Sequence, residues 1–118
     1  MSKQIVIYVE QNPQVKNISL QKASDTDFDQ IFLALSHECG AGYNSEFEQR
    51  SQIKDPVISP ISKQHEGLPM PEVKAGYRII EMYDAVHQGE GTLRIMEHPV
   101  VPHPQEHEIA KIEISVTD

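Results

Sequence analysis

The sequence has no tryptophan and a single cysteine among its 118 residues, and it contains no long hydrophobic run. One cysteine cannot form an internal disulfide, which is typical of a protein in a reducing compartment. Apolar runs reach only five residues, as in Ile5–Val9, whereas a membrane-spanning helix needs about 18. The first residues also lack the layout of a signal peptide. We therefore expect one cytoplasmic domain over residues 1–118, without a membrane segment.

Basic residues are scarce. There are 10 lysines and arginines against 18 aspartates and glutamates, which gives a formal net charge of −8. Binding to nucleic acid requires clustered basic side chains that neutralise phosphates, so the composition argues against a nucleic-acid partner. Acidic residues gather in the last third of the chain, and the predicted surface for a basic protein partner comprises Glu90, Glu97, Glu106 and Glu108. The alternative is that the charge only keeps the protein soluble.

One segment carries the apolar spacing of an amphipathic helix. Ser24 stands where an N-cap belongs, and three aspartates follow within five residues, where the positive end of a helix dipole favours negative charge. The spacing predicts a helix over residues 25–39 with one apolar stripe. The stripe consists of Phe28, Ile31, Phe32, Leu35 and Cys39.

The remaining pattern is typical of strands. Residues 5–9 and 18–20 flank a turn and predict an N-terminal hairpin. Residues 92–96 and 111–117 alternate between apolar and polar side chains, whereas 77–88 fits a strand or a helix, with the strand favoured. The expected fold class is α+β, with a mostly antiparallel sheet of about five strands and one main helix packed across it. This order resembles the β-grasp arrangement of ubiquitin-like proteins, which implies an architecture and no function.

The stretch from residue 41 to residue 75 differs from both of its flanks. Four prolines interrupt it, and its apolar residues are sparse and without period. We expect a long loop within the domain, because no regular element fits this pattern. It is either a mobile functional loop or a segment that Val57, Ile58 and Ile61 pin to the core.

Three histidines lie within ten residues of one another near the end of the chain. His98, His103 and His107 alternate with glutamates, and imidazole and carboxylate are natural ligands of zinc and other divalent metals. Prolines on both sides of His103 favour an extended segment, which would separate the side chains. The alternative is therefore a set of solvated histidines.

Motifs of catalysis and nucleotide binding are missing. No glycine-rich phosphate loop, HExxH or GxSxG pattern occurs. Arg78 and Arg94 could clamp a small anion if their strands were adjacent; pairing with glutamates across strands is the alternative. Cys39 lies on the apolar stripe at the negative end of the expected helix, which is typical of an inert thiol.

Three functions remain open. The first is a small, acidic, non-enzymatic binding or regulatory module that acts through protein–protein contact, as an inhibitor or adaptor, with homo-oligomer formation as a further expectation. The second is a metal-dependent protein that uses the histidine cluster. The third is a protein or enzyme that binds a small anion through its two arginines.

Overall fold

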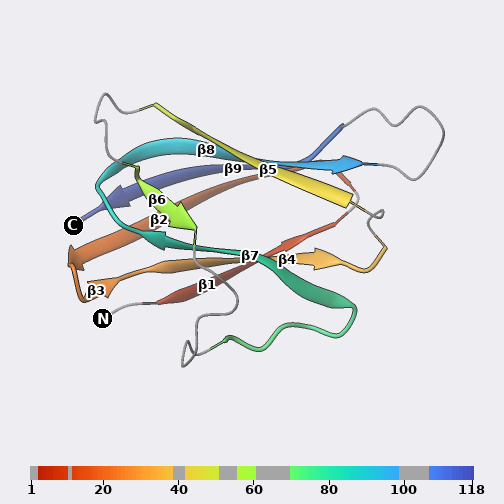
Figure 1. The fold of residues 1–118 in the computed structure, drawn as a ribbon, viewed down its shortest axis with the longest axis horizontal. Helices are drawn as coiled ribbons and strands as arrows, with labels where there is room; N and C mark the ends of the chain where they lie inside the picture. The colour runs from red at the N-terminus through yellow and green to blue at the C-terminus, as the bar shows by residue number, and fades with distance from the viewer. Residues whose placement is uncertain (1–2, 11, 39–41, 51–55, 61–69, 99–106) are drawn as a thin grey trace.

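The computed structural model describes residues 3–10, 12–38, 42–50, 56–60, 70–98 and 107–118, and within these ranges all regular structure is β-strand. Two sheets pack face to face as a sandwich (Figure 1). The nine strands of these ranges are β1 (Gln4–Val9), β2 (Gln14–Ser24), β3 (Asp27–Phe28), β4 (Gln30–Ser36), β5 (Gly42–Gln49), β6 (Ile58–Pro60), β7 (Tyr77–Ala85), β8 (Gly89–His98) and β9 (His107–Thr117). This part of the chain holds no helix with the length and apolarity that crossing a membrane requires.

The strand order separates several strands that are neighbours in sequence, β1 and β2 among them. One sheet has the order β1-β4-β7-β6 and the other β3-β2-β9-β8-β5. The predicted N-terminal hairpin is therefore wrong, because β1 pairs in parallel with β4, whereas β2 pairs in parallel with β9. The chain crosses from one sheet to the other between β1 and β2. These two strands therefore pair with strands that come later in the sequence.

The predicted helix over residues 25–39 is also wrong, and with it the α+β class. The structure places β3 and β4 there, joined through Asp29. The residues Ile31–Leu35 form an uninterrupted apolar run, and every one of them is buried. A strand covered on both faces is apolar at all positions, so it satisfies a helical spacing as well as its own. Cys39 lies outside the described residues.

The core lies between the two sheets. Ile31, Leu33 and Leu35 of β4 belong to the same cluster of buried side chains as Ile112 and Ile114 of β9. In β9 the buried residues alternate with half-buried ones, which confirms the strand predicted over 111–117. The segment 77–88, for which the sequence fitted a strand or a helix, contains the strand β7 at Tyr77–Ala85.

The outer face of the four-stranded sheet is covered too. Phe32 of β4 is fully buried although it does not belong to the inter-sheet cluster. The segment 70–76 lies against this face, since the ammonium of Lys74 stands 4.7 Å from the ring centre of Tyr8. Tyr8 in turn meets Tyr77 edge to face at 5.0 Å between ring centres.

The expected long loop contains regular structure. β5 occupies its first part, and β6 pairs with the end of β7. Val57 and Ile58 are buried in the core, as an anchor of this segment would be, while Ile61 falls outside the described residues. Part of the stretch 41–75 is therefore built into the sandwich.

Candidate functional site

One end of the sandwich gathers four connections. β1 leads into β2 there, β4 into β5 and β8 into β9, and the segment 70–76 enters β7 beside them, at the right of Figure 1. The strand registers show this directly, because Ser36 pairs with Tyr77 and Gly42 pairs with His98. We call this region the loop end.

A cleft of about 560 Å³ opens at the loop end. Hydrogen bonds join the segments around it: the Tyr77 hydroxyl donates to Oε1 of Glu10 at 2.5 Å, and the His37 N–H donates to the Gly76 carbonyl at 2.8 Å. The side chains of His37 and Glu38 are exposed. The residues that line the cleft are Glu10, Asn12, Ser36, His37, Glu38, Ala75, Gly76 and Tyr77.

A histidine–carboxylate pair stands at the base of the β8–β9 connection. Nε2 of His107 lies 3.1 Å from Oε2 of Glu97, and Glu97 is only 6% exposed. Glu97 follows the inward-facing Ile95 by two residues, so its carboxylate points into the end of the core. Protonation of His107 would turn this contact into an ion pair.

Only His107 of the three histidines in the predicted metal site has a described side chain, so the structure does not test that site. His103 and Glu106 fall outside them, and the side chain of His98 is likewise not described. In these ranges no three potential metal ligands converge. The zinc site remains a prediction from the sequence.

The two predicted anion-binding arginines lie on different sheets. Arg78 belongs to β7 of the four-stranded sheet, and Arg94 belongs to β8 of the five-stranded sheet. Nη2 of Arg94 stands 3.8 Å from Oε2 of Glu48 on β5. The adjacency that an anion clamp requires is absent between these two residues.

The predicted acidic surface is not continuous either. Glu90 and Glu97 stand at opposite ends of β8, and Glu97 is buried. Glu108 is half-buried on β9. Glu97 is buried because its position faces the other sheet. The sequence suggested an exposed side chain, because glutamate is charged.

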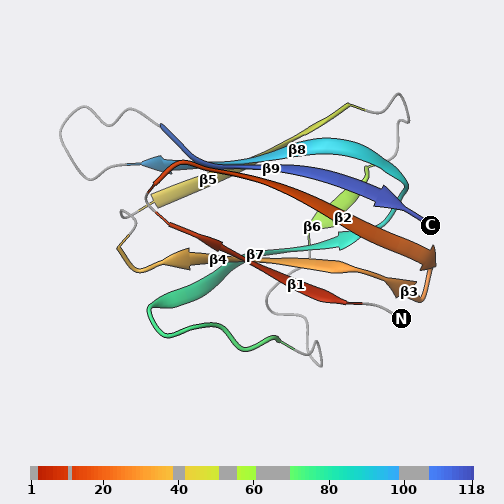
Figure 2. The ribbon, with the colours of Figure 1, turned by 180° about the vertical axis from the view of Figure 1, so that it is seen from behind.

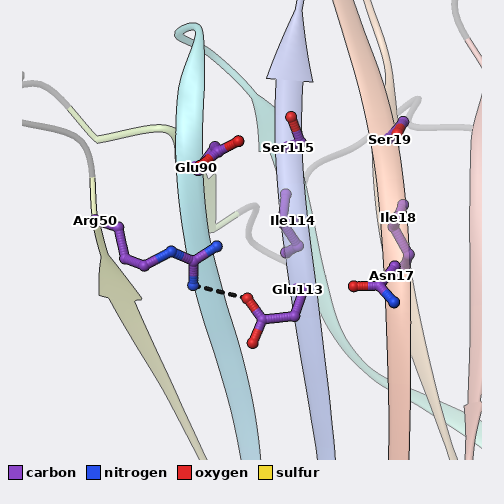
Figure 3. A pocket seen from close by; sticks show the side chains of 8 residues that line it. All are labelled: Asn17, Ile18, Ser19, Arg50, Glu90, Glu113, Ile114 and Ser115. Atoms are coloured by element: carbon purple, nitrogen blue, oxygen red, sulfur yellow. Dashed lines mark ion pairs between the residues drawn. The ribbon is translucent and has the colours of Figure 1, made fainter.

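A second, shallower pocket of about 400 Å³ lies on the outer face of the five-stranded sheet (Figure 3). Nη1 of Arg50 reaches across β8 to Oε2 of Glu113 at 2.7 Å, and the Thr92 hydroxyl donates to the same oxygen at 3.0 Å. The Thr92 hydrogen bond, together with Arg50, lowers the pKa of Glu113 below its usual value. No sequence motif pointed to this cluster, because its members come from distant parts of the chain.

A polar network also crosses between the sheets. The Tyr83 hydroxyl of β7 lies 3.1 Å from the Ser45 hydroxyl of β5 and donates to Oε2 of Glu81 at 2.9 Å. Burial raises the pKa of Tyr83, so the phenol stays neutral in the folded protein. The Tyr43 hydroxyl donates to the Ile80 carbonyl at 3.0 Å. These bonds fix the position of β5 over β7.

Comparison with known proteins finds a similar fold and no family. No family model and no curated protein matches this chain. Among solved structures, it is similar to the cysteine protease inhibitor EhICP2 from Entamoeba histolytica, with a TM-score of 0.50 and 10% identity over 98% of this chain and 97% of that one. A second similar structure is the solution structure of amebosin, with a TM-score of 0.37 and 14% identity over 90% of this chain and 100% of that one. The first likeness shows that this chain and the inhibitor share an architecture along almost their whole length.

Proposed function

We propose that this protein is an inhibitor that binds a cysteine protease through its loop end. The observation that carries the proposal is the convergence of four connections at one end of a two-sheet scaffold. Loops on a rigid sandwich are the usual location of binding residues. The similar architecture of a cysteine protease inhibitor supports this class of partner.

Hydrogen bonds connect the described residues of the loop end before any partner arrives. The Tyr77–Glu10 and His37–Gly76 hydrogen bonds join three segments that are distant in sequence. A surface that is already ordered loses little conformational entropy when it binds, which is a condition for tight inhibition.

The charge of the loop end suits a basic rim on the partner. Glu10 and Glu38 are exposed there, and the whole chain carries a net charge of −8. Electrostatic attraction of this kind raises the association rate and weakens as salt is added.

The direct test is inhibition of a papain-type cysteine protease, followed with a fluorogenic peptide substrate. We expect activity to fall as this protein is added, while trypsin stays unaffected. The double variant His37→Ala/Glu38→Ala removes one imidazole and one carboxylate from the loop end. It should weaken inhibition by about tenfold or more, which is the scale of an interface hot spot.

A matched variant at the other end of the sandwich provides the control. Asp25→Ala/His87→Ala also removes one carboxylate and one imidazole, and both residues line a pocket at the turns that follow β2 and β7. Inhibition by this variant should equal that of the wild type. An inactive wild type, or equal losses in the two variants, would refute the proposal.

A further inference from the structure

The outer edge of β2 presents backbone groups to solvent. The N–H of Gln21 donates to Oδ2 of Asp29 at 2.8 Å, and its carbonyl accepts from the Asp29 N–H at 2.9 Å. Gln21 therefore directs its backbone away from β9. In a parallel ladder alternate residues face the same side, so Val15, Asn17 and Ser19 direct theirs to this open edge as well.

No strand covers this part of β2 among the residues that the structure describes. β3 pairs with β2 only from Lys22 onward, which leaves the edge open over 14–20. In Figure 2 this portion of β2 runs across the front of the molecule. Val15, Asn17 and Ser19 are all exposed, and Val15 is 73% exposed.

The other sheet edges are less suited to pairing. β6 has three residues and ends in Pro60, and β5 displays Glu46 and Glu48, so two copies of β5 would place like charges together. On β1, the Gln14 side-chain amide donates to the Tyr8 carbonyl at 3.1 Å and accepts from the Glu10 N–H at 3.2 Å, which shortens the open edge. The edge of β2 is thus the longest without proline, acid or cap among the described strands.

Charge distinguishes this edge from the rest of the protein. Gln14–Ser24 contains two lysines, Lys16 and Lys22, and no acidic residue, in a chain of net charge −8. Most other contacts between two copies would bring acidic surfaces together. The edge of β2 is where two copies can approach with the least repulsion.

We propose that two copies of this protein associate through antiparallel pairing of their β2 edges. The register that uses every open group places Asn17 opposite Asn17 of the second copy, and Val15 opposite Ser19. It forms about six backbone hydrogen bonds, two for each facing pair. The two sheets then join into one continuous sheet, and the two loop ends point in opposite directions.

Lys16 limits the strength of this pairing. In the proposed register it stands opposite Ile18 of the second copy, diagonal to the other Lys16. The two ammonium groups repel each other weakly, and a lysine on an edge strand is a known device against uncontrolled pairing. The association is therefore reversible and should tighten when Lys16 is replaced by threonine.

The test is sedimentation equilibrium from micromolar to millimolar protein, at low and high salt. We expect a monomer–dimer equilibrium that shifts toward dimer at high salt, because salt screens the repulsion between two acidic copies. Asn17→Pro removes one edge-directed N–H from each copy and should weaken dimerisation by about tenfold or more. Asn17→Ala keeps the backbone group and should leave the equilibrium unchanged.

A second variant covers the outcome in which Asn17→Pro fails to fold, as circular dichroism would show. Val15→Lys/Ser19→Lys keeps the backbone intact and places lysines opposite each other in both facing pairs. It should dissociate the dimer at low salt and recover part of the association at high salt. A monomer at all concentrations, a dimer indifferent to these changes, or an edge occupied by a strand of another protein would overturn the proposal.

Discussion

The carboxylate of Asp29 receives the backbone N–H of Gln21 at 2.8 Å and that of Lys3 at 2.9 Å. Asp29 is 1% exposed and stands between β3 and β4, where the chain passes from one sheet to the other. Its own carbonyl accepts from the Ala85 N–H at 3.0 Å. One buried carboxylate thus ties together the beginning of β1 and the end of β2.

Replacing this carboxylate should destabilise the protein strongly. Asp29→Ala leaves two backbone N–H groups without their acceptor, at a cost of about 1–3 kcal/mol for each buried group. We expect the free energy of unfolding in urea to fall by about 2–5 kcal/mol. The control is Asp27→Ala, which changes a half-buried aspartate two residues away. An equal loss of unfolding free energy in this variant would mean that the Asp29 hydrogen bonds contribute little.

Ile31 tests the position of the core. Ile31→Ala removes a fully buried side chain between the sheets and should cost about 2–5 kcal/mol, the usual range for such a truncation. Val15→Ala removes apolar atoms from a side chain that is 73% exposed and should change stability by less than about 0.5 kcal/mol. A loss below about 1 kcal/mol for Ile31→Ala, where core truncations normally exceed it, would show that the site is not packed as described.

Tyr83 makes stability depend on alkaline pH. Its pKa is raised in the folded protein by burial, whereas in the unfolded chain it ionises near pH 10. The contribution of the neutral Tyr83 phenol to stability is therefore complete below about pH 10. As the pH rises further, the free energy of unfolding falls by at most about 1.4 kcal/mol per pH unit from this group.

Urea titrations on both sides of that pH check this effect. In Tyr83→Phe, which has no phenol to ionise at this position, the stability should fall less steeply with pH than in the wild type. Ser45→Ala removes a hydrogen-bond partner but keeps the phenol, so its steep alkaline loss should persist. Equal slopes in wild type and Tyr83→Phe would contradict the role of this phenol.

Glu113 should titrate below the usual range for a glutamate, since the Thr92 hydroxyl, together with Arg50, lowers its pKa. Its contribution to stability is thus present above the unfolded pKa and is lost as the pH falls. Thr92→Val removes the hydroxyl and should raise the pKa of Glu113, as followed by carboxyl carbon chemical shifts. Thr117→Val makes the same change at an exposed position and should leave this titration unaltered.

The sequence predicted strands where one face is solvated. In β9 the apolar residues Ile112, Ile114 and Val116 alternate with polar ones, so the period of two is visible. In β4 it is hidden, because Phe32 and Ala34 are buried outside the inter-sheet cluster, whereas Ile31 is buried within it. Which face of a strand is covered is decided by tertiary contacts, and periodicity alone carries no record of them.

The loop end was beyond prediction for a related reason. Its cleft depends on Glu10 lying beside Tyr77, which follows from β1 and β7 flanking β4 in one sheet. The sequence pattern indicated both strands, but it did not indicate which strands are neighbours in the sheet. The predicted histidine site relied on proximity in sequence, and the predicted arginine site relied on an assumed adjacency of two strands that belong to different sheets.

The parallel pairing of β2 with β9 has a consequence for the order of folding during synthesis. β2 is made early, yet its neighbour in the sheet is β9, the last strand described. β8 also has β9 as a neighbour, so the five-stranded sheet cannot close until β9 has left the ribosome. Closure over such a long stretch of chain is slow. A ribosome-bound chain that stops before Ile112 should accordingly remain sensitive to protease, and release of β9 should bring protection in one step.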